Sequence, residues 1–399
     1  NLANAQNTFV SGTISADALE NGDGGRVIIW ADGDTSFTGL ITAKGGSNSG
    51  NGGFVETSGK NIVLSGFVNT LASKGKAGIY FIDPDDIEIN ESSLSSAGSS
   101  AGYSLITTST IDSNLDGGNV IISTATHSGD GITTDGGDIA VKAAINDSSG
   151  NALTLTATDQ IRTSGTGTIS ITGDLTLNAG NGGISAGTAL TTNGTLTTNS
   201  VGSQSFTKNI TANALNLTTT QDGSGVDMSK YQGGTITADL ENGGLDITTT
   251  SGNISIASID VTGTDGVADV TLTSAGTISD SDTSNEGANI IASTVSLSAE
   301  TGIGGSGASD IDTTASNLIL STTTSGNIFV SDSDAVTLSS SSTASNGSID
   351  VRTDSGDLTV SSAVTADGSG GITLNSAGNL VVNNVLTSTS GNISLTGAT

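Results

Sequence analysis

The stretch SGNISLTGAT, residues 390–399, contains the motif on which the fold of this chain depends. Similar motifs, here called SGN motifs, occur upstream as SGNISIAS from Ser251, SGNIFVSD from Ser325, SGDLTVSS from Ser355 and AGNLVVNN from Ala377. Gly and Asn can take the positive φ that tight corners require, and alternate residues of a strand point to the same face. Each motif therefore predicts a corner followed by a short strand, with Ile393 and Leu395 pointing inward and Ser394 outward.

The SGN motifs recur with a regular spacing. Measured at their aliphatic residues, Ile349 and Ile372 are 23 residues apart, Leu358 and Leu380 are 22 apart, and Ile372 and Ile393 are 21 apart. A repeat of roughly 20–50 residues is typical of a solenoid. Coils this short cannot hold a strand–helix–strand crossover, but they fit a parallel β-helix in which Ile stacks on Ile and Leu on Leu. Successive parallel crossovers favour the right-handed sense. We therefore expect an all-β, right-handed parallel β-helix (β-solenoid) of about 22 residues per coil.

The composition agrees with short strands and many turns. The chain has 399 residues, 57 of them Gly, with one Pro and no Cys, and only 33% of its residues are apolar. Such low hydrophobicity with net negative charge would suggest disorder. However, the apolar residues are mostly Ile, Val and Leu at alternate positions, which is the pattern of half-buried strands. No window shows convincing helical periodicity. We therefore expect strands throughout.

Charge and hydropathy narrow the function classes. The formal charge of −29, with only ten Lys and Arg, argues against nucleic acid as a partner. No apolar run approaches the ~18 residues of a membrane span, so we expect no membrane insertion. The absence of Cys leaves the compartment open. Asn1 does not open a signal peptide, so any targeting segment has been removed or lies outside these residues. Residues 390–399 form an ordinary coil rather than a cap, and we expect the natural polypeptide to continue beyond Thr399.

The beginning of the chain differs from the repeats. Seven of the eleven aromatic residues precede position 82: Phe9, Trp30, Phe37, Phe54, Phe67, Tyr80 and Phe81. Bulky side chains could fill a wider cross-section, and the sole Pro, Pro84, predicts a break in the strand ladder. We expect an aromatic-containing β-helical head segment over residues 1–100 and a Ser/Thr/Gly-rich β-helical repeat stalk over residues 101–399. The boundary is gradual, near residues 90–115.

Two stretches of the head carry a family resemblance. GGRVIIWADGDTSFTGLITAKGGSNSGNGGFVETSGK (residues 24–60) and GIYFIDPDDIEI (residues 78–89) resemble secreted bacterial exoproteins of the filamentous haemagglutinin type, which belong to two-partner secretion systems. The resemblance implies a right-handed β-helical stalk, secreted to the bacterial cell surface through an outer-membrane transporter partner and used for adhesion or cell–cell contact. The family's N-terminal secretion domain is not seen, so this segment resembles the part downstream of it.

Catalysis is not expected. β-Helical glycan enzymes need clustered carboxylates, often with Arg or Ca²⁺. This chain has three Arg (Arg26, Arg162 and Arg352), one His (His127) and no Cys. His127 has no obvious partner and is expected in an exposed turn. Asp is favoured in turns for backbone reasons alone. We therefore assign no catalytic residue and no cofactor.

Calcium is the one ion that the sequence could hold. Acidic groups that could offer oxygens occur at Asp32 and Asp34, at Asp83, Asp85 and Asp86, at Asp280 and Asp282, and at Asp332 and Asp334. None of them matches a known calcium-loop pattern, and solvated acidic turns are the simpler interpretation. If calcium binds, Asp83, Asp85 and Asp86 are the first candidates, because the carboxylates are densest there.

The sequence thus predicts a non-enzymatic extracellular stalk or adhesin that holds a binding region away from the cell. Its receptor, a surface receptor or glycan on a host or neighbouring cell, is not identified. An alternative in the same class is a self-assembling extracellular filament or sheath subunit, in which cations bridge the acidic turns. An alternative of another class is a glycan-active β-helix enzyme.

Overall fold

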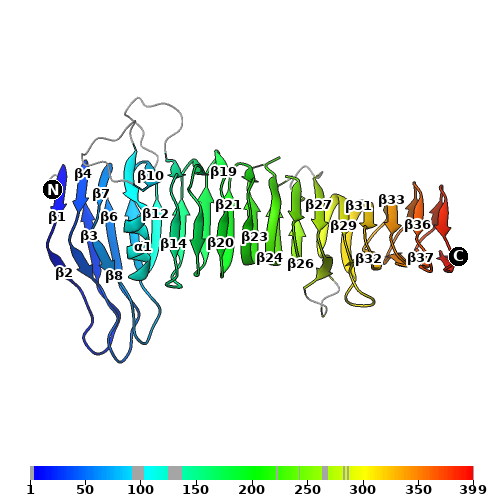
Figure 1. The fold of residues 1–399 in the computed structure, drawn as a ribbon, viewed down its shortest axis with the longest axis horizontal. Coiled ribbons are helices and arrows are strands. Elements are labelled where there is room, and N and C mark those ends of the chain that lie inside the picture. The colour runs from blue at the N-terminus through cyan, green and yellow to red at the C-terminus, as the bar shows by residue number, and fades with distance from the viewer. Residues whose placement is uncertain are drawn as a thin grey trace. The chain divides into compact units, whose positions relative to one another are not determined.

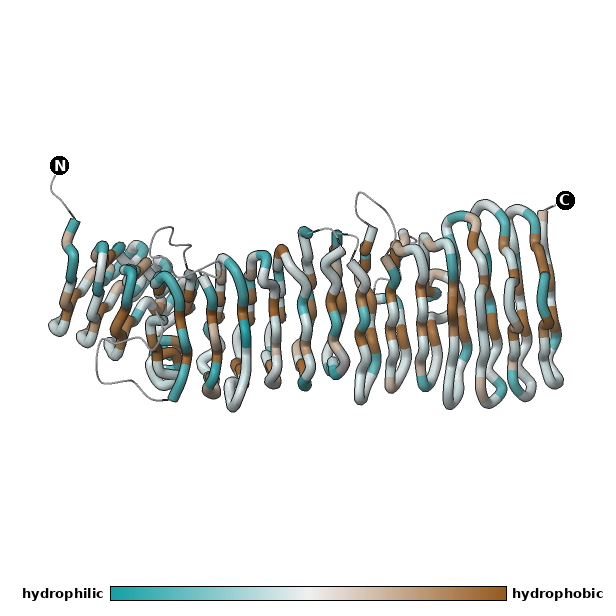
Figure 2. The backbone as a smooth tube through the Cα atoms, turned by 90° about the horizontal axis from the view of Figure 1, so that it is seen from above, coloured by the Kyte–Doolittle hydropathy of each residue, from teal (hydrophilic) through white to brown (hydrophobic). Residues whose placement is uncertain are grey.

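The computed structural model describes residues 4–91, 103–124, 137–221, 223–241, 243–262, 268–281, 284 and 287–398. Short parallel strands make up nearly all of its regular structure (Figure 1). The chain forms two compact units, Asn1–Thr211 and Ala212–Thr399, and strand β23 (Ile210–Thr219) contains the boundary between them. The predicted fold class, a parallel β-helix, is confirmed in each unit. Apolar segments recur from coil to coil (Figure 2).

The first unit begins with three parallel sheets, and each coil contributes one strand to each sheet. The first sheet contains β1 (Asn7–Val10), β4 (Asp34–Phe37) and β7 (Asn61–Leu64). The second contains β2 (Thr13–Ser15), β5 (Leu40–Thr42) and β8 (Phe67–Asn69). The third runs from β3 (Arg26–Trp30) through β6 (Phe54–Ser58) and β9 (Ile79–Asp83) to β12 (Asn119–Ser123). Asn7 pairs with Asp34 and Asp34 with Asn61, so these coils are 27 residues long.

The coils of the first unit shorten after this head. Leu153 pairs with Leu175 and Leu175 with Leu196, and all three side chains are fully buried, so the coils here have 22 and 21 residues. The remaining strands of this unit are β10 (Ile87–Asn90), β11 (Ser104–Thr107), β13 (Ile139–Val141), β14 (Ile145–Asp147), β15 (Leu153–Thr156), β16 (Gln160–Thr163), β17 (Ile169–Ile171), β18 (Leu175–Ala179), β19 (Gly183–Ala186), β20 (Leu190–Thr192), β21 (Thr195–Ser200) and β22 (Gln204–Phe206).

The second unit repeats the same arrangement. Its strands are β24 (Val226–Leu240), β25 (Leu245–Thr249), β26 (Ile254–Asp260), β27 (Asp269–Ser274), β28 (Thr277–Asp280), β29 (Ile290–Ala299), β30 (Gly302–Ile303), β31 (Ile311–Thr322), β32 (Ile328–Asp332), β33 (Val336–Thr343), β34 (Ile349–Thr353), β35 (Leu358–Val360), β36 (Val364–Ala366), β37 (Ile372–Asn375), β38 (Leu380–Val382), β39 (Leu386–Ser388) and β40 (Ile393–Thr396).

The spacing that predicted the coil is the register of the structure. Ile349 pairs with Ile372, Ile372 with Ile393, and Leu358 with Leu380. Ile349, Ile372 and Leu358 are buried, which confirms a core of stacked aliphatic side chains. Ile393 and Leu395 continue the same columns, but they are about half exposed because no described coil covers them.

One helix departs from the expectation of strands throughout. Helix α1 (Thr108–Asp116) begins after Thr107, whose hydroxyl accepts a hydrogen bond from the backbone N–H of Thr110 at 3.2 Å. It buries Ile111, Asn114 and Leu115, which are spaced as neighbours on one helical face. The prediction was wrong here because two aliphatic residues in nine give too weak a periodicity. The packing of this face decides the conformation instead.

The expected wider cross-section in the head is also wrong for most of the aromatic residues. Only Phe37 and Tyr80 lie in the core, where the Tyr80 hydroxyl donates to Thr57 Oγ1 at 3.2 Å. Phe9 and Trp30 are exposed, and the other three rings are partly exposed. The longer coils of the head therefore arise from connecting loops rather than from a bulkier core. The compositional division into residues 1–100 and 101–399 stays a prediction.

Candidate functional site

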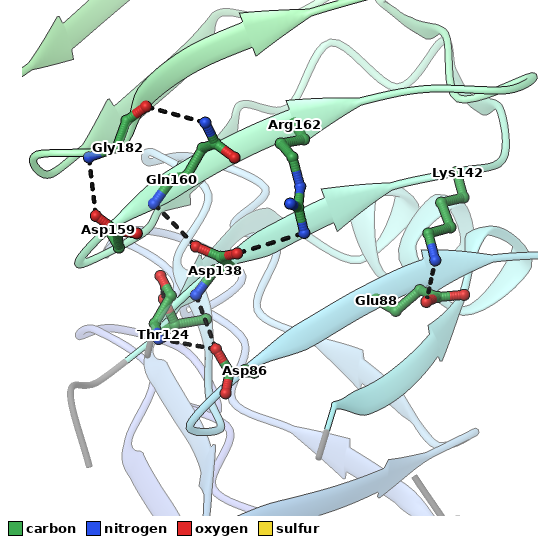
Figure 3. Close-up of polar contacts among 10 residues, drawn as sticks. Asp86, Glu88, Thr124, Asp138, Lys142, Asp159, Gln160, Arg162 and Gly182 are labelled. Atoms are coloured by element: carbon green, nitrogen blue, oxygen red, sulfur yellow. Dashed lines mark hydrogen bonds and ion pairs between the residues drawn. The ribbon is translucent and has the colours of Figure 1, made fainter. Parts of the chain in front are cut away.

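The three aspartates proposed as calcium ligands have different roles in the structure. Asp83 ends strand β9, whereas Asp85 and Asp86 lie between β9 and β10. Oδ1 of Asp86 accepts hydrogen bonds from the backbone N–H groups of Gly137 and Asp138, both at 2.8 Å (Figure 3). The Asp86 carboxylate therefore fastens its own corner to the start of strand β13.

Asp83 is the carboxyl of this group with the most perturbed titration. Burial raises the pKa of Asp83 to about 6, and the negative charges of Glu56 and Asp85 add to the rise. Across the described ranges, no set of three His, Cys, Asp or Glu side chains is arranged to hold a metal ion. Calcium binding at Asp83, Asp85 and Asp86 stays a prediction.

The corner that follows Asp86 continues in the same way on the next coils (Figure 3). Asp138 Oδ1 accepts from the backbone N–H of Gln160 at 3.1 Å, and Asp138 Oδ2 lies 3.4 Å from Nη2 of Arg162. Burial raises the pKa of Asp138, although the positive charge of Arg162 opposes the shift. One coil further, Asp159 Oδ1 accepts from Gly182 N–H at 2.8 Å. These acidic side chains are therefore acceptors for the backbone of the neighbouring coil.

This inter-coil side-chain bond recurs in both units. In each case an Asp or Asn oxygen accepts from a backbone N–H between 21 and 28 residues later: Asp17 from Lys44, Asp23 from Asn51, Asp174 from Thr195, Asn253 from Thr277, Asp269 from Thr294, Asn327 from Ser348 and Asp357 from Asn379. Three of these residues are the third residue of an SGN motif, Asn253, Asn327 and Asp357. The motif therefore specifies a bond between coils as well as a corner.

The corner itself is formed by the glycine of the motif. Gly326 has φ 94° and Gly356 has φ 72°, whereas the Asn and Asp that follow them are not among the residues with positive φ. The expectation that Asn also supplies the positive φ is wrong for these motifs. Gly takes the left-handed conformation, and this leaves the Asn or Asp side chain to bond the next coil.

The other predicted acidic turns are also partnered. Asp32 accepts from Asn4 Nδ2 at 3.2 Å, and Asp34 accepts from Asn61 Nδ2 at 2.9 Å. Asp280 accepts from Asn289 Nδ2 at 2.9 Å, whereas Asp282 lies outside the described residues.

Asp332 departs furthest from a solvated turn, because it is fully buried. It accepts from Thr313 Oγ1 at 2.7 Å and from the N–H groups of Ala315 and Asp334, each at 3.0 Å. Burial raises its pKa, although these hydrogen bonds oppose the shift. The interpretation of these turns as simply solvated is therefore corrected.

The three arginines each pair with a carboxylate. Arg26 Nη2 lies 3.7 Å from Glu56 Oε2, Arg162 pairs with Asp138 as described, and Arg352 Nη2 lies 3.0 Å from Asp310 Oδ2. The pairs come from different coils, so they serve as further links within each unit. His127 lies outside the described residues.

The largest hollow beside these links is an open groove of about 800 Å³ along helix α1. Its walls are Leu64, Ser65, Gly66 and Phe67 on one side, Thr107, Ser109, Thr110, Ser113 and Asp116 on the helix side, and Glu91. The volume lies within the range of small-molecule sites. Sequence reasoning missed this groove because it missed the helix. The cue was the cap-like Thr107 before a short segment with Ile111 and Leu115 on one face.

Comparisons with known proteins leave the resemblance to the haemagglutinin-type exoproteins as a prediction. No protein-family model matches the chain. A search of curated proteins also finds no match. In the part of the chain that the structure describes, no helix is both long and apolar enough to cross a membrane.

Proposed function

We propose that this chain is a non-enzymatic, extracellular stalk or adhesin segment of a bacterial cell surface, holding a binding region away from the cell. The observation that carries the proposal is the residue-by-residue register of coils of near-constant length within each unit. Leu153, Leu175 and Leu196 illustrate it, since three equivalent leucines of successive coils stack in one buried column. Such a stack extends by adding coils, which suits a spacer.

The bonds between coils support a mechanical role. Parallel strands join neighbouring coils along their faces, and the inter-coil side-chain bonds join them at the corners. A force that separates two coils must break these hydrogen bonds together rather than one after another. Few of these links depend on a ligand or a disulfide, because the chain has no Cys.

The charge of the chain and the resemblance of residues 24–60 and 78–89 support the location. A charge of −29 keeps such segments apart in solution through self-repulsion. The resemblance to two-partner secretion exoproteins supports export through an outer-membrane transporter partner to the cell surface. Within this proposal, the partner that the stalk presents to another cell is a separate question.

Two measurements test the proposal. Antibodies raised against residues 1–399 should label intact, unpermeabilised cells of the source bacterium, and sedimentation velocity should find the purified chain as an elongated monomer. Labelling only after permeabilisation would overturn the location. Regular fibres in the electron microscope, dependent on Ca²⁺, would favour the filament or sheath subunit instead.

The groove along helix α1 gives the enzyme alternative a place to be tested. Glu91 and Asp116 both line it, and two carboxylates are what glycan hydrolysis requires. Incubation with a panel of polysaccharides should release no reducing ends and no unsaturated sugars. Release that is lost in Glu91→Gln and in Asp116→Asn would replace the stalk proposal with a glycan-active enzyme.

A further inference from the structure

The outer face of the sheet formed by β3, β6, β9 and β12 is apolar, although the protein as a whole is acidic and polar. Ile28 is 51% exposed and Trp30 is 42% exposed. Four further apolar side chains on this face are partly exposed. We call the six residues the apolar patch: Ile28, Trp30, Phe54, Ile79, Phe81 and Ile121.

The register of the sheet brings these residues together. Phe54 pairs with Ile79 on the next coil. Ile28 pairs with Glu56, Glu56 with Phe81, and Phe81 with Ile121, which makes one outward column across four strands. The intervening positions, such as Ile29, Val55 and Tyr80, point into the core and are buried. The patch therefore lies on four adjacent strands of one unit.

The coil architecture does not require this patch. The same outward column continues from Ile121 into Thr154, Thr176 and Thr197 on the following strands. These threonines lie at equivalent positions on the same sheet, and they form the polar surface expected of a solvated strand. Replacing the apolar side chains by Thr is thus compatible with the coil, and their presence on the first strands needs another reason.

The patch already holds one cation. The guanidinium carbon of Arg26 lies 4.8 Å from the centre of the Phe54 ring, and Arg26 Nη2 lies 3.7 Å from Glu56 Oε2. The Phe54 and Phe81 rings are stacked with their centres 6.3 Å apart. Aromatic faces beside a carboxylate are a favourable environment for Lys and Arg side chains.

The charge of the protein points to the sign of the partner. The chain carries 39 Asp and Glu against ten Lys and Arg. Glu56 lies within the patch, and Asp83 ends the strand that carries Phe81. A second copy of this chain, an anionic membrane or a nucleic acid would be repelled, whereas a basic surface would be attracted over a long range.

We propose that the apolar patch binds a partner protein segment that presents apolar and Lys or Arg side chains together. The apolar side chains of the partner lie against Trp30, Ile28 and Phe81, and its cations lie beside Glu56 and Asp83 in the way that Arg26 lies beside Glu56. This inference does not depend on the stalk proposal, because it concerns one surface and a partner of stated chemistry.

Trp30 makes the proposal directly testable, since it is the only tryptophan of the chain and belongs to the patch. The probe is a synthetic peptide of alternating Leu and Lys, titrated into the full chain while Trp30 emission is recorded. We expect a saturable blue shift and an affinity that falls as salt is added. A Ser–Lys peptide and a Leu–Glu peptide should bind at least about tenfold more weakly.

The variants Phe81→Thr and Ile28→Thr place on this column the residue that it carries further along the sheet. Each should weaken the Leu–Lys peptide about tenfold or more, whereas Thr176→Ala on the same column should not. Thermal unfolding checks that each variant is folded, and because the two substitutions lie on different strands, loss of one fold leaves the other as a test. Equal affinity of wild type and both variants would overturn the proposal. A Trp30 response to neutral oligosaccharides but not to the Leu–Lys peptide would overturn it in favour of a glycan surface.

Discussion

Asn114 replaces part of a missing strand, and its substitution offers the sharpest test of the structure. The backbone edge of strand β8 faces helix α1 instead of another strand. Asn114 Oδ1 accepts from the N–H of Val68 at 2.8 Å, while its Nδ2 donates to the carbonyls of Gly66 at 3.1 Å and Thr110 at 2.7 Å. The side chain is 1% exposed, so water cannot take over these bonds. The variant to make is Asn114→Ala.

The magnitude follows from the bonds that are lost. Leaving the buried Val68 N–H without its acceptor costs about 1–3 kcal/mol, and the lost bond to the Gly66 carbonyl adds about 1 kcal/mol. Ala is the better helix former and returns at most about 0.7 kcal/mol. We therefore expect Asn114→Ala to lower the free energy of unfolding by about 2–4 kcal/mol. With a urea dependence of about 1–3 kcal/mol per molar, the midpoint should fall by about 1 M or more.

The assay is urea unfolding of the whole chain, followed by Trp30 fluorescence, because Trp30 lies in the same unit as α1. Ser113→Ala is the matched control, since Ser113 lies on the exposed side of the same helix and its loss should change stability by less than about 0.5 kcal/mol. If Asn114→Ala and Ser113→Ala unfold at the same urea concentration, helix α1 does not satisfy the edge of β8, and the account of this region is wrong.

Four further predictions concern single side chains of the first unit. The pKa of Asp83 is raised to about 6 from its usual 3.8, so this carboxyl contributes stability that is present below about pH 4 and is lost as the pH rises through about 6; Asp83→Asn should flatten that part of a melting-temperature profile, and an unchanged profile would contradict it. Leu175→Ala should cost about 2–5 kcal/mol in urea unfolding, because Leu175 is stacked between two buried leucines, whereas Thr176→Ala beside it should cost far less. Asp138→Ala should cost about 1–3 kcal/mol by removing the acceptor of an inter-coil bond, and Asp138→Asn, which keeps an acceptor oxygen, should recover most of it; equal losses would show that the bond is unimportant. If the predicted calcium site exists, calorimetric titration of Ca²⁺ should give binding heat that disappears in Asp83→Asn, and the absence of heat in the wild type would remove the site.

The candidate sites were only partly predictable from the sequence. The acidic residues at Asp83, Asp85 and Asp86 could be located by their density, but their roles could not. Asp86 bonds the backbone of a coil that lies more than fifty positions further along, and no local pattern reports that distance. The apolar patch left a signal that was overlooked. Residues 27–30 are apolar at every position, so a two-residue alternation must place some of them outside.

What the sequence by itself determined is the coil. Alternating aliphatic residues specify strands, glycine specifies corners, and the spacing of Ile349, Ile372 and Ile393 specifies the register, because each of these signals acts within a few residues or repeats along the chain. Only the tertiary structure decided that α1 takes a strand's place, that Trp30 faces outward and that the turn aspartates bond the next coil. These outcomes depend on which backbone edges and surfaces are left unpaired once the coils have stacked, and that is a property of neighbours distant in sequence.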